Sequence, residues 1–184
     1  NALERLARGG ERIVGFVTGD GERRADDKGN ADLGMFMAQM EGRGMRAVPL
    51  NFAQVTAVPQ HTDLVVLASP ELALPDGAVK ALTDYVSNGG NLLWLSEPTN
   101  DDLHLAPLAD ALGIRILPGV LVDGQGAALG LKDPRMLALG DYPQHAITRG
   151  FQLTTLFPQV SALAMAARTD WKVAPFLRWS AQSW

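Results

Sequence analysis

Runs of apolar residues alternate with amphipathic stretches along the first two thirds of the chain. Residues 12–17 and 63–68 are largely apolar at successive positions, as strands covered on both faces are. Strands that alternate with helices are joined by right-handed crossovers and form a mainly parallel sheet. The pattern predicts strands at 12–17, 45–50, 63–68, 91–95 and 114–117.

Three stretches between these strands carry apolar residues at the spacing of a helix. Pro75 and Asp76 suit the start of the second helix, because proline has a fixed φ and an acid favours the positive end of the helix dipole. The Asn88-Gly89-Gly90 segment ends that helix, and Asp101 or Asp102 can cap the third. The side chains expected to face the core are Leu33, Phe36, Met37, Met40, Val79, Leu82, Tyr85, Val86, Leu105, Leu108 and Leu112, with Trp94 in the fourth strand.

The last third of the chain is less regular, and we interpret it as a β-rich C-terminal extension of the same domain. Residues 11–184 are therefore predicted to form a single α/β domain, with a core at 12–117 and an extension at 118–184. Residues 1–10 resemble a tag remnant and lead-in, so we expect a fragment of a larger protein. The extension is expected to hold a loop at 124–140 and short strands at 120–123, 146–148, 153–156, 161–165 and 173–179.

Composition excludes several classes of function. The net charge of −4 and pI near 5.3 give no electrostatic reason to expect nucleic acid as a partner. The chain has no cysteine, which excludes disulfides, thiolate metal sites and a cysteine nucleophile. No stretch reaches the roughly 18 apolar residues of a membrane span.

Polar residues follow several predicted strands, where open α/β sheets bind ligands. Thr18 and Asp20 lie in the glycine-rich turn after the first strand. The turn supplies G-x-G but no third glycine, so a tight turn is favoured over a dinucleotide site. The candidate crevice comprises Thr18, Asp20, Ser69, Glu71, Glu97 and Asp123; the alternative is that these are ordinary polar strand ends.

No catalytic residue, metal site or cofactor is predicted. The three histidines, His61, His104 and His145, lack metal-type spacing. A glutaminase of this general fold needs a nucleophilic thiolate assisted by histidine, and the thiolate is missing. A hydrolase using Ser69 or another serine stays open as an alternative.

Several local patterns, taken in order, resemble one known family. The turn from Val17 to Arg23 is similar to the family's T-G-H-G-E-R-like turn, with Asp20 in place of the usual histidine. The other matching segments are 44–51, 63–70, 82–98, 112–114, 119–123, 145–148 and 156–158. Together they resemble the extracytoplasmic domain of gliding-motility-type (GldG-like) auxiliary components of ABC transporters.

The resemblance implies a three-layer fold similar to flavodoxin-like, class I glutamine amidotransferase-like domains that have lost catalysis. It also implies a protein anchored by flanking membrane segments on the extracytoplasmic (periplasmic) side, with an ABC permease and ATPase as partners. The first hypothesis is thus a non-enzymatic accessory domain for protein contacts or ligand sensing. The second is a binding module for a small polar ligand such as a sugar, and the third is the serine hydrolase.

Overall fold

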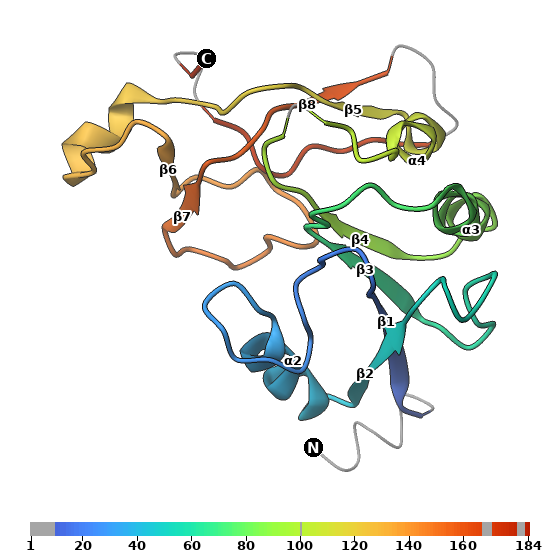
Figure 1. The fold of residues 1–184 in the computed structure, drawn as a ribbon. Coiled ribbons are helices and arrows are strands. Elements are labelled where there is room, and N and C mark those ends of the chain that lie inside the picture. Colours follow the sequence, from blue (N-terminus) through green and yellow to red (C-terminus); the bar gives the residue numbers. More distant parts are fainter. Residues whose placement is uncertain (1–9, 100, 167–170, 180–182) are drawn as a thin grey trace. The chain divides into compact units, whose positions relative to one another are not determined.

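The computed structural model describes residues 10–99, 101–166, 171–179 and 183–184, so the expected lead-in at 1–9 lies outside the described part. The chain divides into two compact units. The first is made of Asn1–Ser96 with Asp101–Ala111, and the second of Glu97–Asn100 with Leu112–Trp184. Each unit is built around its own strands (Figure 1).

The first unit holds a four-stranded, entirely parallel sheet in the order β2-β1-β3-β4. This confirms the predicted parallel α/β core. Its strands are β1 (Arg12–Val17), β2 (Met45–Leu50), β3 (Leu64–Ala68) and β4 (Leu92–Leu95). In the central pair, Val14 lies opposite Leu64 and Phe16 opposite Val66.

Right-handed crossovers to either side of the β1–β3 pair place helices α2 (Gly34–Glu41) and α3 (Asp76–Ser87) on opposite faces of the sheet (Figure 1). Successive strand residues alternate between the two faces. The buried cluster on the α2 face consists of Val14, Phe16, Met37, Val66 and Ala68. Full burial of one such side chain contributes about 1.5–3 kcal/mol, so this cluster is a principal support of the unit.

Helix α2 corrects one core prediction. Met37 is buried, and Leu33 and Met40 pack against its cluster, but Phe36 is 49% exposed. Phe36 precedes Met37 and so lies about 100° around the helix from it, at the margin of the buried stripe. The N–H of Gly34 donates to the Asp27 carbonyl oxygen at 3.0 Å, which brings the helix start close to the preceding loop.

Helix α3 begins at Asp76 after Pro75, as predicted, and buries Val79, Leu82 and Val86. It ends at Ser87, and two residues later Gly89 has the left-handed φ of +86° that glycine adopts without strain. The Tyr85 ring lies over Gly90, so closely that a Cβ there would fall 2.5 Å from ring atoms. Tyr85 is half-buried, and its hydroxyl donates to the Thr62 carbonyl oxygen at 3.2 Å.

Strand β4 lies at one edge of the sheet, so its apolar run, which is typical of a buried strand, is only partly covered. Leu93 and Leu95 are 38% and 36% exposed, and Trp94 is half-buried. A turn then leads into helix α4 (Ala106–Leu112). In this turn the Asp102 side chain accepts a hydrogen bond from the His104 N–H at 3.0 Å. Leu105 and Leu108 are buried as predicted, and Leu112 is half-buried.

The second unit holds two separate antiparallel strand pairs. Strand β5 (Ile114–Ile116) pairs with β8 (Leu163–Met165), and β6 (Met136–Leu139) pairs with β7 (Thr155–Pro158). A 3-10 helix, η1, covers Gly124–Leu129. The prediction that 114–117 continues the parallel sheet is therefore wrong, because this short strand finds an antiparallel partner 49 positions later along the chain.

Other predictions in this unit need correction as well. The expected loop at 124–140 contains η1 and β6. Residues 120–123, 146–148 and 173–179 form no strand, although Val122 exchanges two backbone hydrogen bonds with Trp184. The strands expected at 153–156 and 161–165 occur as the shorter or shifted β7 and β8.

Candidate functional site

The order of strands reverses between β1 and β3, because β2 lies beyond β1 and β4 lies beyond β3. In open α/β sheets, the carboxyl ends of the strands at such a switch point border the crevice where ligands bind. In this structure two loops lie at the switch point, residues 18–23 after β1 and residues 69–73 after β3. We refer to these as the β1 loop and the β3 loop.

Backbone hydrogen bonds join the two loops. The N–H groups of Glu71 and Leu72 both donate to the Asp20 carbonyl oxygen, at 2.9 and 3.0 Å. The Arg23 N–H donates to the Ala68 carbonyl oxygen at 2.9 Å. The structure thus brings together Asp20, Ser69 and Glu71, as their positions after the strands predict, and ligand binding by them stays a prediction.

Two glycines allow the β1 loop to pass this close to its neighbour. Gly19 and Gly21 have φ values of +131° and +84°, which side chains rarely adopt. A Cβ on Gly21 would lie only 2.8 Å from the Glu71 Cβ. Thr18 is half-buried at the start of the loop, and its N–H donates to the Leu50 carbonyl oxygen at 3.0 Å.

Ser69 is buried at the end of β3, and its φ of +52° is unusual for a residue with a side chain. Its hydroxyl oxygen accepts from the Arg23 Nε at 3.2 Å, and the Arg23 guanidinium also donates to the Ala31 carbonyl oxygen at 2.8 Å. A guanidinium keeps its protons at neutral pH and cannot serve as a general base. This contact therefore gives Ser69 no activation as a nucleophile.

Glu22 is the residue of this site that sequence reasoning missed. It is only 8% exposed, although it lies in a charged stretch of sequence. Its Oε2 accepts from the Asp20 N–H at 2.8 Å, which folds the carboxylate back into the β1 loop. Its Oε1 is buried and has no hydrogen-bond partner among the described residues.

Asp20 is half-buried and lies next to Glu22, since its N–H donates to the Glu22 carboxylate. Burial raises the pKa of the Asp20 carboxyl above its ordinary value of 3.8. The β1 loop therefore concentrates two desolvated carboxylates, with the exposed Glu71 carboxylate on the adjoining β3 loop.

The other two predicted site residues belong to the second unit. Glu97 is exposed there. Asp123 is buried and caps η1, since its Oδ1 accepts from the Gln125 N–H at 2.7 Å. Its Oδ2 accepts from the Ser183 hydroxyl at 2.7 Å. Asp123 thus has a local structural role that its place after an apolar run does not reveal.

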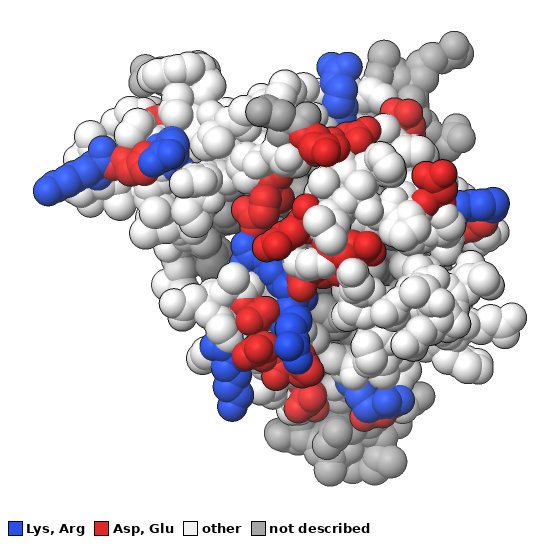
Figure 2. Space-filling model, in the orientation of Figure 1, with Lys and Arg blue, Asp and Glu red and all other residues white. Residues whose placement is uncertain are grey.

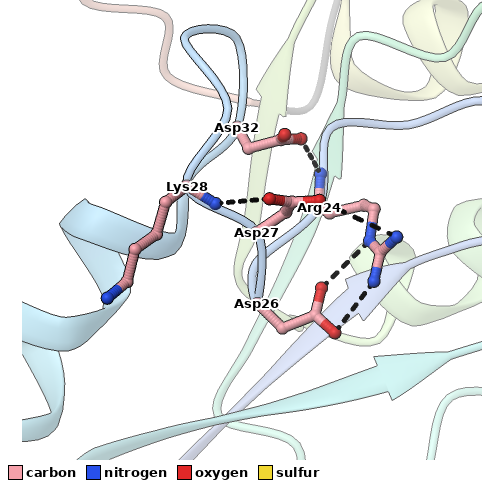
Figure 3. Close-up of polar contacts among 5 residues, drawn as sticks. All are labelled: Arg24, Asp26, Asp27, Lys28 and Asp32. Carbon is pink, nitrogen blue, oxygen red and sulfur yellow. Dashed lines mark hydrogen bonds and ion pairs between the residues drawn. The ribbon is translucent and has the colours of Figure 1, made fainter.

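The charged segment after the β1 loop is largely exposed, and its side chains contact one another and the backbone (Figure 3). The Arg24 guanidinium donates to both carboxylate oxygens of Asp26, at 3.1 and 3.2 Å, and this contact lowers the pKa of Asp26. The Asp32 carboxylate accepts from the Arg24 N–H at 2.9 Å, and the Asp27 carboxylate from the Lys28 N–H at 2.7 Å. These acids hold the loop together and leave little capacity for a ligand.

Neither the histidines nor the charge distribution adds a second site. His61 and His104 are exposed, and the ring of His145 stacks on Phe176 with centroids 5.3 Å apart. Within the described ranges, no group of three or more His, Asp or Glu side chains is arranged to hold a metal ion. On the face shown in Figure 2, basic side chains lie singly or beside acidic ones. No helix in the described part is long and apolar enough to cross a membrane.

The chain is similar to a protein family and to a solved structure. The family model described as an ABC-type uncharacterized transport system (ABC_transp_aux) matches residues 11–184. The chain is also similar to a solved structure titled "mmIFT52 N-terminal domain", with 16% sequence identity and a TM-score of 0.62. That match covers 83% of this chain and 73% of the other, and at this identity it shows a shared fold alone. No curated protein matches the chain significantly.

Proposed function

The chain belongs to the auxiliary family of ABC-type transport systems, and from that premise we propose that it is a non-enzymatic accessory domain that contacts the transporter. The observation that carries the proposal is the family match, which spans nearly the whole chain. Two observations support it: the Arg23 guanidinium that donates to the Ser69 hydroxyl oxygen cannot act as a base, and the chain holds no cysteine. The partners we propose are the permease and ATPase subunits.

We further propose a GldG-like domain with a flavodoxin-like, glutamine amidotransferase-like fold that lacks the nucleophile. The strand order β2-β1-β3-β4 supports this, since flavodoxin-like sheets begin with the same order. The helices on opposite faces of the sheet are compatible with three layers (Figure 1). The β1 loop, which carries the T-G-D-G-E-R sequence, lies at the carboxyl edge where related folds place their ligands.

The direct test is co-purification of the full-length protein from detergent-solubilised membranes, with quantitative mass spectrometry of the eluate. The proposal predicts that an ABC permease and its ATPase are recovered in fixed stoichiometry and survive a wash in high salt. Recovery of the full-length protein without either subunit, under conditions where permease and ATPase stay together, would contradict it.

Placement on the extracytoplasmic side is a separate proposal, and the absence of cysteine makes it easy to test. Met35 is 68% exposed on α2, and Val65 is fully buried on β3. In the full-length protein, cleared of any other cysteine, Met35→Cys should react with a membrane-impermeant maleimide on intact cells. Val65→Cys, the matched control, should react only after denaturation. Labelling of Met35→Cys only after the cells are permeabilised would place the domain on the cytoplasmic side.

A small-polar-ligand module is the second candidate, favoured by one observation. The two loops at the switch point meet around a buried carboxylate, Glu22, whose Oε1 has no hydrogen-bond partner among the described residues. Accessory contacts and ligand sensing are compatible, because a transporter subunit can report on a bound ligand. A thermal-shift screen of metabolites tests this candidate as a class, and a chain that responds to none would argue against it.

A further inference from the structure

We propose that a small organic cation binds where the β1 and β3 loops meet, and that its ammonium group donates a hydrogen bond to Glu22 Oε1. This inference goes beyond the accessory role, since it concerns a ligand site within the first unit and holds whether or not the chain contacts a transporter. It rests on burial, hydrogen bonding and the sign of the local charge.

The unsatisfied oxygen is the primary observation. Glu22 is more than nine-tenths buried, and its Oε2 already accepts from the Asp20 N–H at 2.8 Å. That bond fixes the carboxylate inside the β1 loop, so Oε1 also lies at the loop that borders the switch point. Buried polar atoms without partners are rare in folded proteins, and such an atom calls for a partner such as water, an ion or a ligand. A bound ammonium group would supply that partner to Oε1.

The surrounding charge selects a cation. The two contacting loops carry three carboxylates, Asp20, Glu22 and Glu71, and one guanidinium, Arg23. The Arg23 guanidinium donates to the Ser69 hydroxyl oxygen and to the Ala31 carbonyl oxygen. These hydrogen bonds orient it toward acceptors other than the three carboxylates. A positively charged donor gains more from such a site than a neutral hydroxyl does, because charge-assisted hydrogen bonds are the stronger kind.

An ammonium fits the donor set better than a metal ion. No group of three or more acidic or histidine side chains in the described part of the chain is arranged around one point. A divalent cation needs several oxygen ligands at once. A primary ammonium needs only a few acceptors, which Glu22 Oε1 and the half-buried Asp20 carboxylate can supply.

A ligand can reach Glu22 Oε1 only if the β1 loop moves, because this oxygen is shielded from solvent. Asp20 lies between two exposed glycines, Gly19 and Gly21, whose backbones tolerate many conformations. Among the described residues, two backbone hydrogen bonds tie this part of the loop to the β3 loop, and both are accepted by the Asp20 carbonyl oxygen. A ligand that replaces these contacts can therefore reach the buried carboxylate.

A matched pair of probes tests the proposal by NMR on the isotope-labelled 184-residue chain. Putrescine carries ammonium groups on a four-carbon chain, and 1,4-butanediol carries hydroxyls on the same chain. Putrescine should cause saturable shifts of the backbone amides of residues 19–23 and 71–72, and the diol should not. Glu22→Gln should weaken putrescine binding by about tenfold or more, as loss of a charged acceptor does. Asp26→Asn, which removes an exposed acid paired with Arg24, should leave binding unchanged.

Three results would overturn the proposal. The first is the absence of saturable shifts with putrescine, and the second is an equal response to 1,4-butanediol. The third is unchanged binding in Glu22→Gln with a native-like spectrum. If Glu22→Gln does not fold, Asp20→Asn takes its place, because it removes a neighbouring charge and keeps the backbone carbonyl that joins the loops. Retention of full affinity in Asp20→Asn would count against the site in the same way.

Discussion

Replacement of Gly21 by alanine tests whether the β1 and β3 loops meet as described. Gly21 has a φ of +84°, a conformation that costs an alanine roughly 1–2 kcal/mol. The new Cβ would also lie 2.8 Å from the Glu71 Cβ. That neighbour is attached directly to the backbone and cannot swing aside, so we expect an overpacking cost of about 1–3 kcal/mol in addition. The free energy of unfolding should therefore fall by about 2–5 kcal/mol.

Gly89 provides the matched control for the backbone cost. It has nearly the same φ, +86°, but a Cβ there meets nothing within 4 Å. Gly89→Ala should therefore lose about 1–2 kcal/mol, the conformational part alone. The difference between the two variants measures the contact between the loops.

Urea unfolding followed by circular dichroism supplies both free energies, and a double-mutant cycle isolates the contact. Adding Glu71→Gly removes the opposing Cβ, so the Gly21→Ala cost should shrink by about 1–3 kcal/mol in that background. The reasoning fails if Gly21→Ala and Gly89→Ala lose the same stability, or if Glu71→Gly leaves the cost of Gly21→Ala unchanged. Either result would mean that the loops do not approach this closely.

Three further predictions concern the first unit. Gly34→Ala should destabilise by at least about 2 kcal/mol, because its Cβ would lie 2.2 Å from a backbone carbonyl oxygen. Gly77→Ala on α3, where nothing lies within 4 Å, should instead stabilise by about 0.4–1 kcal/mol; urea unfolding that ranks them in reverse would refute this. Leu67→Ala should lower the free energy of unfolding by about 2–5 kcal/mol, since Leu67 is fully buried. Leu72→Ala should change it by less than about 0.5 kcal/mol, since Leu72 is 62% exposed. Equal losses would contradict the core assignment. Because burial raises the pKa of Asp20 above 3.8, the native state holds that proton more tightly, and stability falls as pH rises through the interval between the unfolded and native pKa values. Asp20→Asn should therefore melt at the same temperature as the unmodified chain near about pH 3 and higher near about pH 7, and a lower melting temperature at neutral pH would show that the sign is wrong.

The parallel core could be predicted from sequence because its signals are local and strong. The run at 63–68 is apolar at nearly every position, and α3 has a proline at its start and two glycines at its end. Hydrophobic periodicity does not encode pairing, however, so the three-residue strand β5 was assigned to the wrong sheet. The true partner, β8, is equally short and lies far away in sequence.

The sequence predicted the residues of the candidate site only where the order of strands in the sheet is enough to bring them together. Asp20, Ser69 and Glu71 follow strands that prove to be neighbours, so their loops meet. Glu97 and Asp123 follow apolar runs too, but the chain places them in the second unit. Glu22 gave no signal of burial, because it opens a charged stretch, and its environment depends on the backbone conformation of the two glycines before it. Loop geometry of this kind cannot be derived from residue spacing.

The central claim is that this domain contacts an ABC transporter, and site-specific photo-crosslinking in native membranes tests it most directly. A photoreactive benzoylphenylalanine would replace an exposed apolar residue of each unit in the full-length protein: Leu72, 62% exposed, and Leu153, 69% exposed. Exposed apolar positions are those where protein contacts are expected. The account predicts a light-dependent adduct with the permease or ATPase from at least one of them, and none without irradiation. Absence of any such adduct from both positions, in cells where the transporter is present and assembled, would contradict it.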